Sequence, residues 1–208
     1  ANPAPPNARY YRRQRSAMAD SLESLSTELG AKNVKSQISE KWSSKVPQFR
    51  DHLRSALRDF TSCDTVLNNK NVFKYSDGYF SISHSEKAGG FVTADIPIGL
   101  DIETKNRSLS EKAYLRISDE EERSLGLSPI ELWVAKEASF KALNSIFYSE
   151  KSPSPDFSLK TISQIKITSI HPFNSEFASR FTYKLRNFNG LEGRLKGLLI
   201  SQNETCLG

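Results

Sequence analysis

The chain has 208 residues, of which 37% are hydrophobic and 25% charged, and its formal net charge at pH 7 is +5. This length is sufficient to bury a core, and this balance of residue types excludes a disordered chain. The positive charge favours anionic partners, but nucleic acid, phosphorylated cofactors, acidic proteins and membrane surfaces all satisfy it equally.

A membrane-spanning protein and a protein with a signal peptide are not expected. No apolar run approaches the roughly 20 residues that span a bilayer, and the N-terminal stretch ANPAPPNARYYRRQRS lacks the apolar core of a signal peptide. We therefore expect a cytoplasmic location. Cys63 and Cys206 are too few for a disulfide framework or a cysteine zinc site, so we expect free thiols, and any metal would be bound by oxygen.

Helical patterns dominate the first part of the chain. Residues 9–29 are expected to form a helix that ends at Gly30, and residues 46–60 repeat apolar side chains at helical spacing. The other face of this second helix carries Arg50, Arg54 and Arg58. No strand is evident before residue 79.

Strand patterns follow. YFSISHS, residues 79–85, alternates apolar and polar side chains, and the stretch from 89 to 103 continues as two extended pieces broken by Pro97. In PIGLDIET, residues 97–104, the apolar side chains occupy every second position, which puts Asp101 and Glu103 together on the other face. Gly99 is expected to keep that face open for a ligand.

The chain returns to helices over residues 108–146, and the remainder predicts an antiparallel sheet. Three capping boxes predict helix starts, the last with Pro129 at the first helical position: Ser108 with Glu111, Ser118 with Glu121, and Ser128 with Glu131. The sheet is predicted from the segments SQIKITSI, FTYKLRNF and GRLKGLLISQ. Because helix and strand runs are partly segregated, the predicted class is α+β.

A candidate metal site arises from three carboxylates. Asp101 and Glu103 repel each other unless a cation lies between them, and hard cations bind carboxylate oxygens. In the helix that contains WVAKEASFK, Trp133, Glu137 and Lys141 share one face, so Glu137 can join the two strand carboxylates. Mg²⁺ is the expected ion, with Mn²⁺ as the alternative, and Lys141 can contact a phosphate or transfer a proton. Alternatively, Glu137 and Lys141 form an ordinary surface pair, but this requires several coincidences.

In this order and approximate spacing, the segments FSISHS, IGLDIE and WVAKEASFK resemble the signature of the 4'-phosphopantetheinyl transferases. The resemblance covers residues 79–143, and the length is similar to that of the single-chain type that activates surfactin synthetase, not the short trimeric holo-acyl-carrier-protein synthase type. The resemblance implies two pseudo-symmetric halves, each with antiparallel strands on a long helix. We assign residues 1–96 to the half on the coenzyme A side and residues 97–208 to the half with the metal site and the C-terminal sheet.

The activity implied by this resemblance is transfer of the phosphopantetheine arm of coenzyme A to a serine of an apo acyl or peptidyl carrier protein, with release of adenosine 3',5'-bisphosphate. Asp101, Glu103 and Glu137 match the metal carboxylates. Lys141 matches the lysine on the diphosphate, and Glu137 is the candidate base for the acceptor serine. The residues carried over as coenzyme A contacts are Ser83, His84, Lys70, Arg50 and Arg54, together with Asp101 and Lys141.

The expected partners are therefore coenzyme A and the acidic helix of a carrier protein, with the chain acting as a monomer. The pathway, whether fatty-acid, polyketide or nonribosomal peptide synthesis, stays open. Two alternatives also stay open, a basic nucleic-acid-binding module and a catalytically inactive relative, although no nucleic-acid motif or aromatic stacking platform is evident.

Overall fold

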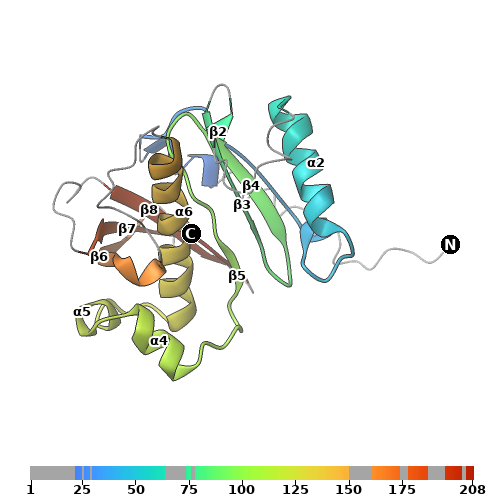
Figure 1. Ribbon diagram of the computed structural model, residues 1–208. Coiled ribbons are helices and arrows are strands. Elements are labelled where there is room, and N and C mark those ends of the chain that lie inside the picture. Colours follow the sequence, from blue (N-terminus) through green and yellow to red (C-terminus); the bar gives the residue numbers. More distant parts are fainter. Residues whose placement is uncertain are drawn as a thin grey trace.

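The computed structural model of the chain describes residues 22–24, 26–28, 30–63, 74–75, 78–149, 161–173, 178–186, 195–202 and 205–208. In these ranges two antiparallel sheets and a few helices confirm the predicted α+β class (Figure 1). No helix in the same ranges has the length and apolar character required to cross a bilayer.

The first sheet comes from the N-terminal part of the chain, with the strand order β1-β4-β3-β2 and antiparallel neighbours throughout. Its strands are β1 (Lys35–Ser39), β2 (Lys74–Tyr75), β3 (Gly78–His84) and β4 (Gly89–Ala94). The expectation of no strand before residue 79 is wrong. β1 has the sequence KSQIS, in which Ile38 is the only large apolar residue, and it lies at the sheet edge, so its periodicity is weak.

Helix α2 (Phe49–Thr61) lies beside β3 and β4 (Figure 1). It buries Leu53 and Leu57 against phenylalanines of these two strands. The predicted helix over residues 46–60 is confirmed apart from its first turn, because Gln48 has a φ of 56° and so stands outside a right-handed helix.

The helix predicted over residues 9–29 is described only in part. Residues 22–24 and 26–28 are helical, and Gly30, with a φ of +99°, ends the helix as expected. The rest of that prediction lies outside the described residues.

The second sheet has the order β5-β9-β8-β7-β6, again antiparallel, and confirms the predicted C-terminal sheet. Its strands are β5 (Ile102–Thr104), β6 (Ile165–Pro172), β7 (Ala178–Leu185), β8 (Leu195–Gln202) and β9 (Thr205–Leu207). The long helix α6 (Pro129–Ser149) covers one face of this sheet (Figure 1). Side chains of β4, β5, β8 and β9 share a further core, which joins the two sheets.

The shorter helices are η1 (Glu40–Trp42), α4 (Glu111–Ile117), α5 (Glu120–Arg123) and η2 (Ile162–Gln164). Of the three predicted capping boxes, only that of α6 is confirmed, with Ser128 and Glu131 bonded to each other's backbone N–H groups. The helices α4 and α5 begin after Ser110 and Asp119 instead. Cys63 and Cys206, both in the part of the chain that the structure describes, form no disulfide bond.

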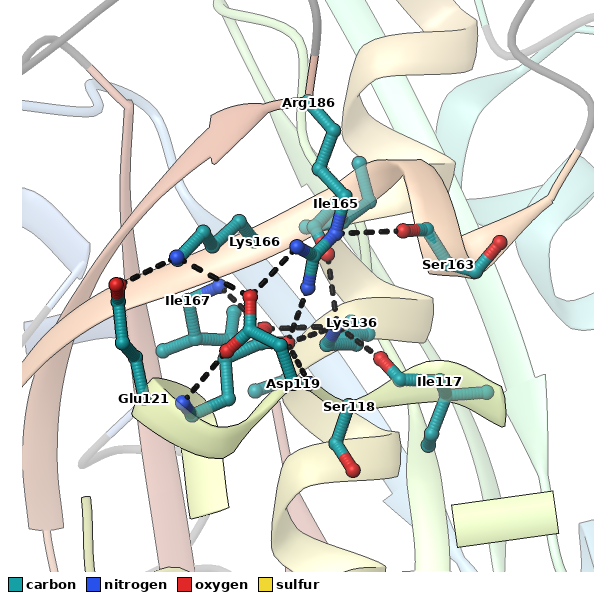
Figure 2. A network of polar contacts seen from close by, with 12 residues as sticks. Ile117, Ser118, Asp119, Glu121, Lys136, Ser163, Ile165, Lys166, Ile167 and Arg186 are labelled. Carbon is teal, nitrogen blue, oxygen red and sulfur yellow. Dashed lines mark hydrogen bonds and ion pairs between the residues drawn. The ribbon is translucent and has the colours of Figure 1, made fainter. Parts of the chain in front are cut away.

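A buried lysine attaches α6 to the elements around it (Figure 2). Lys136 is fully buried, and its Nζ donates to Glu122 Oε2 at 2.9 Å and to the carbonyl oxygen of Ile165 at 2.7 Å. It also donates to the carbonyl oxygen of Ile117. Burial lowers the pKa of Lys136, and the carboxylate of Glu122 opposes this shift. The lysine thus links α6 to the end of α4, to α5 and to β6.

The carboxylates of α5 extend this network to the C-terminal sheet. Arg186 donates to Glu122 Oε2 at 2.5 Å and to Asp119 Oδ2 at 2.6 Å, and Lys166 lies 3.1 Å from the same Asp119 oxygen (Figure 2). Burial alone would raise the pKa of Asp119. The hydrogen bond from the Glu122 N–H and the two cations outweigh burial and hold that pKa well below its ordinary value.

Replacing Lys136 by methionine is expected to lower the free energy of unfolding by about 3–5 kcal/mol, because two buried carbonyl groups would lose their donor and the buried Glu122 would keep only the cation of Arg186. Urea denaturation followed by circular dichroism measures this loss. Lys166→Met is the matched control and should cost under about 1 kcal/mol, since Lys166 pairs with partly exposed carboxylates. Equal losses in the two variants would contradict this assignment.

The network also predicts how stability depends on pH. The folded-state pKa of Asp119 lies below its ordinary value of 3.8, so the unfolded state binds a proton first and stability falls as the pH drops below that value. Asp119→Asn should therefore lose less stability than the wild type between about pH 6 and about pH 3. Urea titrations at several pH values measure the difference, and Asp59→Asn, at an exposed position of α2, should follow the wild type.

Candidate active site

The segment between β4 and β5 lies along β3, where two serine side chains hold it. Ser81 Oγ accepts a hydrogen bond from the Leu100 N–H at 2.9 Å, and Ser83 Oγ accepts one from the Ile102 N–H at 3.0 Å. Because alternate residues of a strand point the same way, these two hydroxyls match two alternate backbone N–H groups. They attach the segment to β3, with which it shares no strand ladder in the part of the chain that the structure describes.

Two further contacts fix the backbone around Asp101. Its N–H donates to the carbonyl oxygen of Gly208 at 2.8 Å, and the Gly208 N–H donates back at 3.1 Å. On the other side, Gly99 lies directly against α6, where a Cβ atom would overlap with backbone atoms of Ala138 and Ala142. The expectation that Gly99 keeps a face open for a ligand is therefore wrong, because glycine here permits close contact between backbones.

This contact brings Lys141 of α6 to Asp101. Lys141 Nζ lies 2.7 Å from Asp101 Oδ1, 2.9 Å from the carbonyl oxygen of Leu100 and 3.4 Å from Ser83 Oγ. Ser83 Oγ also donates to Asp101 Oδ1 at 2.9 Å. One oxygen of Asp101 thus has two donors, and the ammonium group lies among three oxygens.

The second oxygen of Asp101 differs from the first. Asp101 Oδ2 is buried, and no described residue forms a hydrogen bond with it. Glu137 lies one helical turn before Lys141 and is close enough to interact electrostatically with Asp101. Burial raises the pKa of Glu137, Lys141 partly offsets this, and the Asp101 carboxylate raises that pKa further. The site therefore combines an unsatisfied carboxylate oxygen with a second, partly buried carboxyl group.

Glu103, the third predicted metal carboxylate, has a different partner. Its Oε1 accepts from Arg107, whose guanidinium group lies 5.3 Å from the centre of the Trp133 ring. Among the described residues, no group of three or more His, Cys, Asp or Glu side chains is placed to hold a metal ion. In this arrangement Arg107 neutralises the charge that Glu103 was predicted to offer to a metal.

Of the other predicted residues that the structure describes, His84 and Arg50 lie where β3 ends beside the start of α2. The ring of His84 makes an edge contact with Phe49, with 4.6 Å between the ring centres. Burial lowers the pKa of His84, and the positive charges of Arg50 and Lys141 lower it further. His84 thus connects the start of α2 electrostatically to the site around Asp101.

Of the predicted coenzyme A contacts, Ser83 lies at Asp101 itself, whereas Arg54 lies farther along α2. Arg54 lies one turn beyond Arg50 on α2, and Lys70 lies outside the described residues. Ser83, predicted to contact coenzyme A, holds the Asp101 segment. Ser81 was not predicted, although its alternation with Ser83 in SISHS was the available signal.

Two of the side chains at the site have the chemistry of divalent-cation ligands. Asp101 Oδ2 and the Glu137 carboxylate are oxygen donors of the kind that Mg²⁺ and Mn²⁺ accept, and the former has no described hydrogen-bond partner. The described residues thus offer two carboxyl groups of the right chemistry but no set of three, because Glu103 is paired with Arg107.

In comparisons with known proteins, no family model matches the chain and no curated protein matches it significantly.

Gly99→Ala should lower the free energy of unfolding by about 1–3 kcal/mol, because the added methyl group meets helix backbone that cannot turn aside. Hydrogen exchange localises the effect. The Asp101 amide, which donates to Gly208, should exchange faster, whereas amides of the β6–β7 ladder serve as an internal control and should lose only the global stability change. Unchanged stability together with unchanged Asp101 exchange would contradict this explanation.

Proposed function

We propose that the chain is a divalent-cation-dependent 4'-phosphopantetheinyl transferase with coenzyme A as the donor. The observation that carries this proposal is the convergence of Lys141, Glu137 and the unpartnered oxygen of Asp101. A lysine beside two carboxyl groups suits a diphosphate substrate, because phosphoryl transfer depends on positioning and charge neutralisation. The two antiparallel sheets, one beside α2 and the other beneath α6, are compatible with the two-halved fold of that family.

The balanced reaction is a displacement at the phosphorus atom that carries the pantetheine arm. The Oγ atom of the carrier serine forms a bond to this phosphorus atom, and the bond to the bridging diphosphate oxygen breaks. The electron pair leaves with adenosine 3',5'-bisphosphate. A bound Mg²⁺ or Mn²⁺ would neutralise charge on the diphosphate, held by Asp101 and Glu137, with Glu103 as the further ligand.

Glu137, Lys141 and Ser83 have different roles in the proposed reaction. Glu137 receives the proton of the acceptor serine, a role favoured by its raised pKa. Lys141 transfers its contact from Asp101 to a diphosphate oxygen. Ser83 acts as a positioning residue, because it holds Asp101 Oδ1 and the Ile102 N–H at once.

The coenzyme A side is proposed to lie at the start of α2. Arg50 is exposed there and interacts electrostatically with His84, which in turn lies near Lys141. Phosphate groups placed along this line would meet three nitrogen groups from α2, β3 and α6. Arg54 extends the same basic face of α2.

The decisive experiment incubates the chain with coenzyme A, Mg²⁺ and a panel of apo acyl and peptidyl carrier proteins. Mass spectrometry should show the mass of the phosphopantetheine arm added to at least one carrier. Glu137→Gln should lower the transfer rate by about 100-fold or more, as expected for the loss of a general base. Asp101→Ala should abolish transfer.

Two matched controls separate the site from general effects of charge. Glu111→Gln and Lys112→Met alter exposed residues of α4 and should leave the rate unchanged, whereas Lys141→Met should lower it strongly. A folded protein that modifies no carrier in a broad panel would overturn the proposal. Salt-sensitive binding to DNA or RNA that coenzyme A does not displace would support the nucleic-acid alternative instead.

A further inference from the structure

A cavity of about 260 Å³ lies where the two sheets meet α6. Its walls come from β4, the segment before β5, α6, β7 and β8, and most of the side chains are apolar, among them Val92, Ile98, Ala138, Phe181 and Leu198. An engineered apolar cavity of about 150 Å³ already binds benzene. This cavity therefore has room for a larger apolar group.

The cavity is separate from the candidate active site. Gly99 and Leu100 form part of its wall, but the described lining contains none of the side chains proposed to act on coenzyme A. The polar side chains of the lining therefore have no role in the proposed transfer reaction.

One of these polar groups is the hydroxyl of Tyr183. The residue is only 6% exposed and lines the cavity, and its ring packs against that of Phe181. Burial raises the pKa of the phenol above its ordinary value, so the group is a hydrogen-bond donor at neutral pH. A phenol in this wall can therefore donate to an acceptor of a ligand that enters the cavity.

A second polar side chain, Lys196, favours a negatively charged acceptor. Lys196 is exposed and is the one cationic side chain in the described lining. A lysine can lay its aliphatic stem along an apolar wall and keep its ammonium group in water at the opening. No acidic residue is present in the same described lining, so an anionic ligand meets no like charge there.

We propose that this cavity binds a small monocarboxylate with an apolar body. The body fills the apolar space, and the carboxylate accepts a hydrogen bond from Tyr183 while Lys196 neutralises its charge. The cavity size, the phenol donor and the cation together favour this class over a neutral apolar ligand.

The test uses decanoate as the probe and isothermal titration calorimetry on the full chain, in buffer below the micelle concentration. One decanoate should bind per chain. Across shorter saturated acids the affinity should rise by about fourfold for each methylene group that enters the cavity. 1-Decanol should bind at least about fivefold more weakly than decanoate, since it lacks the charge-assisted bond.

Two variants of nearly equal volume locate the ligand. Tyr183→Phe removes only the hydroxyl and should weaken decanoate binding by about three- to tenfold, and Lys196→Gln should weaken it by a similar factor. Lys112→Gln makes the same change of charge on α4, outside the cavity, and should leave the affinity unchanged.

Three results would overturn the inference: no decanoate binding to the folded chain, binding that neither cavity variant alters, or equal binding of decanoate and 1-decanol. None of these results depends on the proposed transferase activity, because no residue assigned to that reaction is changed. Circular dichroism of each variant verifies that the fold is retained.

Discussion

The candidate active site depends on a close contact between two stretches of backbone, one at Gly99 and one in α6. The backbone at Gly99 lies against the backbone of α6, closer than any residue with a Cβ atom would allow. This contact sets how near the segment at Asp101 approaches Lys141, and the 2.7 Å ion pair follows from it. The serine hydroxyls of β3 hold the same segment from its other side. The positions of the charged side chains at the site thus follow from how the backbone is placed.

Helix α6 has a different electrostatic task on each of two faces. Lys136 faces inward to a network in which every charge has a partner, whereas the next residue, Glu137, faces a site in which one carboxylate oxygen has none among the described residues. The first arrangement anchors the helix rigidly. The second leaves unsatisfied bonding capacity for a ligand, and this is the difference expected between a structural and a functional group of charges.

The sequence predicted much of the fold because its periodic patterns are strong. The spacing in 46–60, the alternation in 79–85 and the capping box at Ser128 each correspond to an observed element. β1 was missed because an edge strand with one large apolar residue has hardly any period. Glu137 and Lys141 could be placed on one helix face from their spacing, whereas their approach to Asp101 was an expectation conditional on this helix lying across that segment. The partner of Glu103 could not be foreseen, because Arg107 is only four residues away and a turn decides which group it meets. The network around Lys136 was also missed, since nothing in WVAKEASFK distinguishes a lysine whose surroundings come from residues 117, 122 and 165.

The Lys136 network also has a consequence for the order of folding. Its bonds join residues far apart in the chain, such as Arg186 and Glu122, which are separated by 64 positions. They require α5, α6 and the C-terminal sheet to be in place, and loop closure of that kind is entropically costly before other contacts hold the ends together. We therefore expect the network to form late, on the native side of the folding barrier. Its strength is felt mainly in the rate at which the folded chain opens, so it contributes to the lifetime of the native state more than to the speed with which that state is reached.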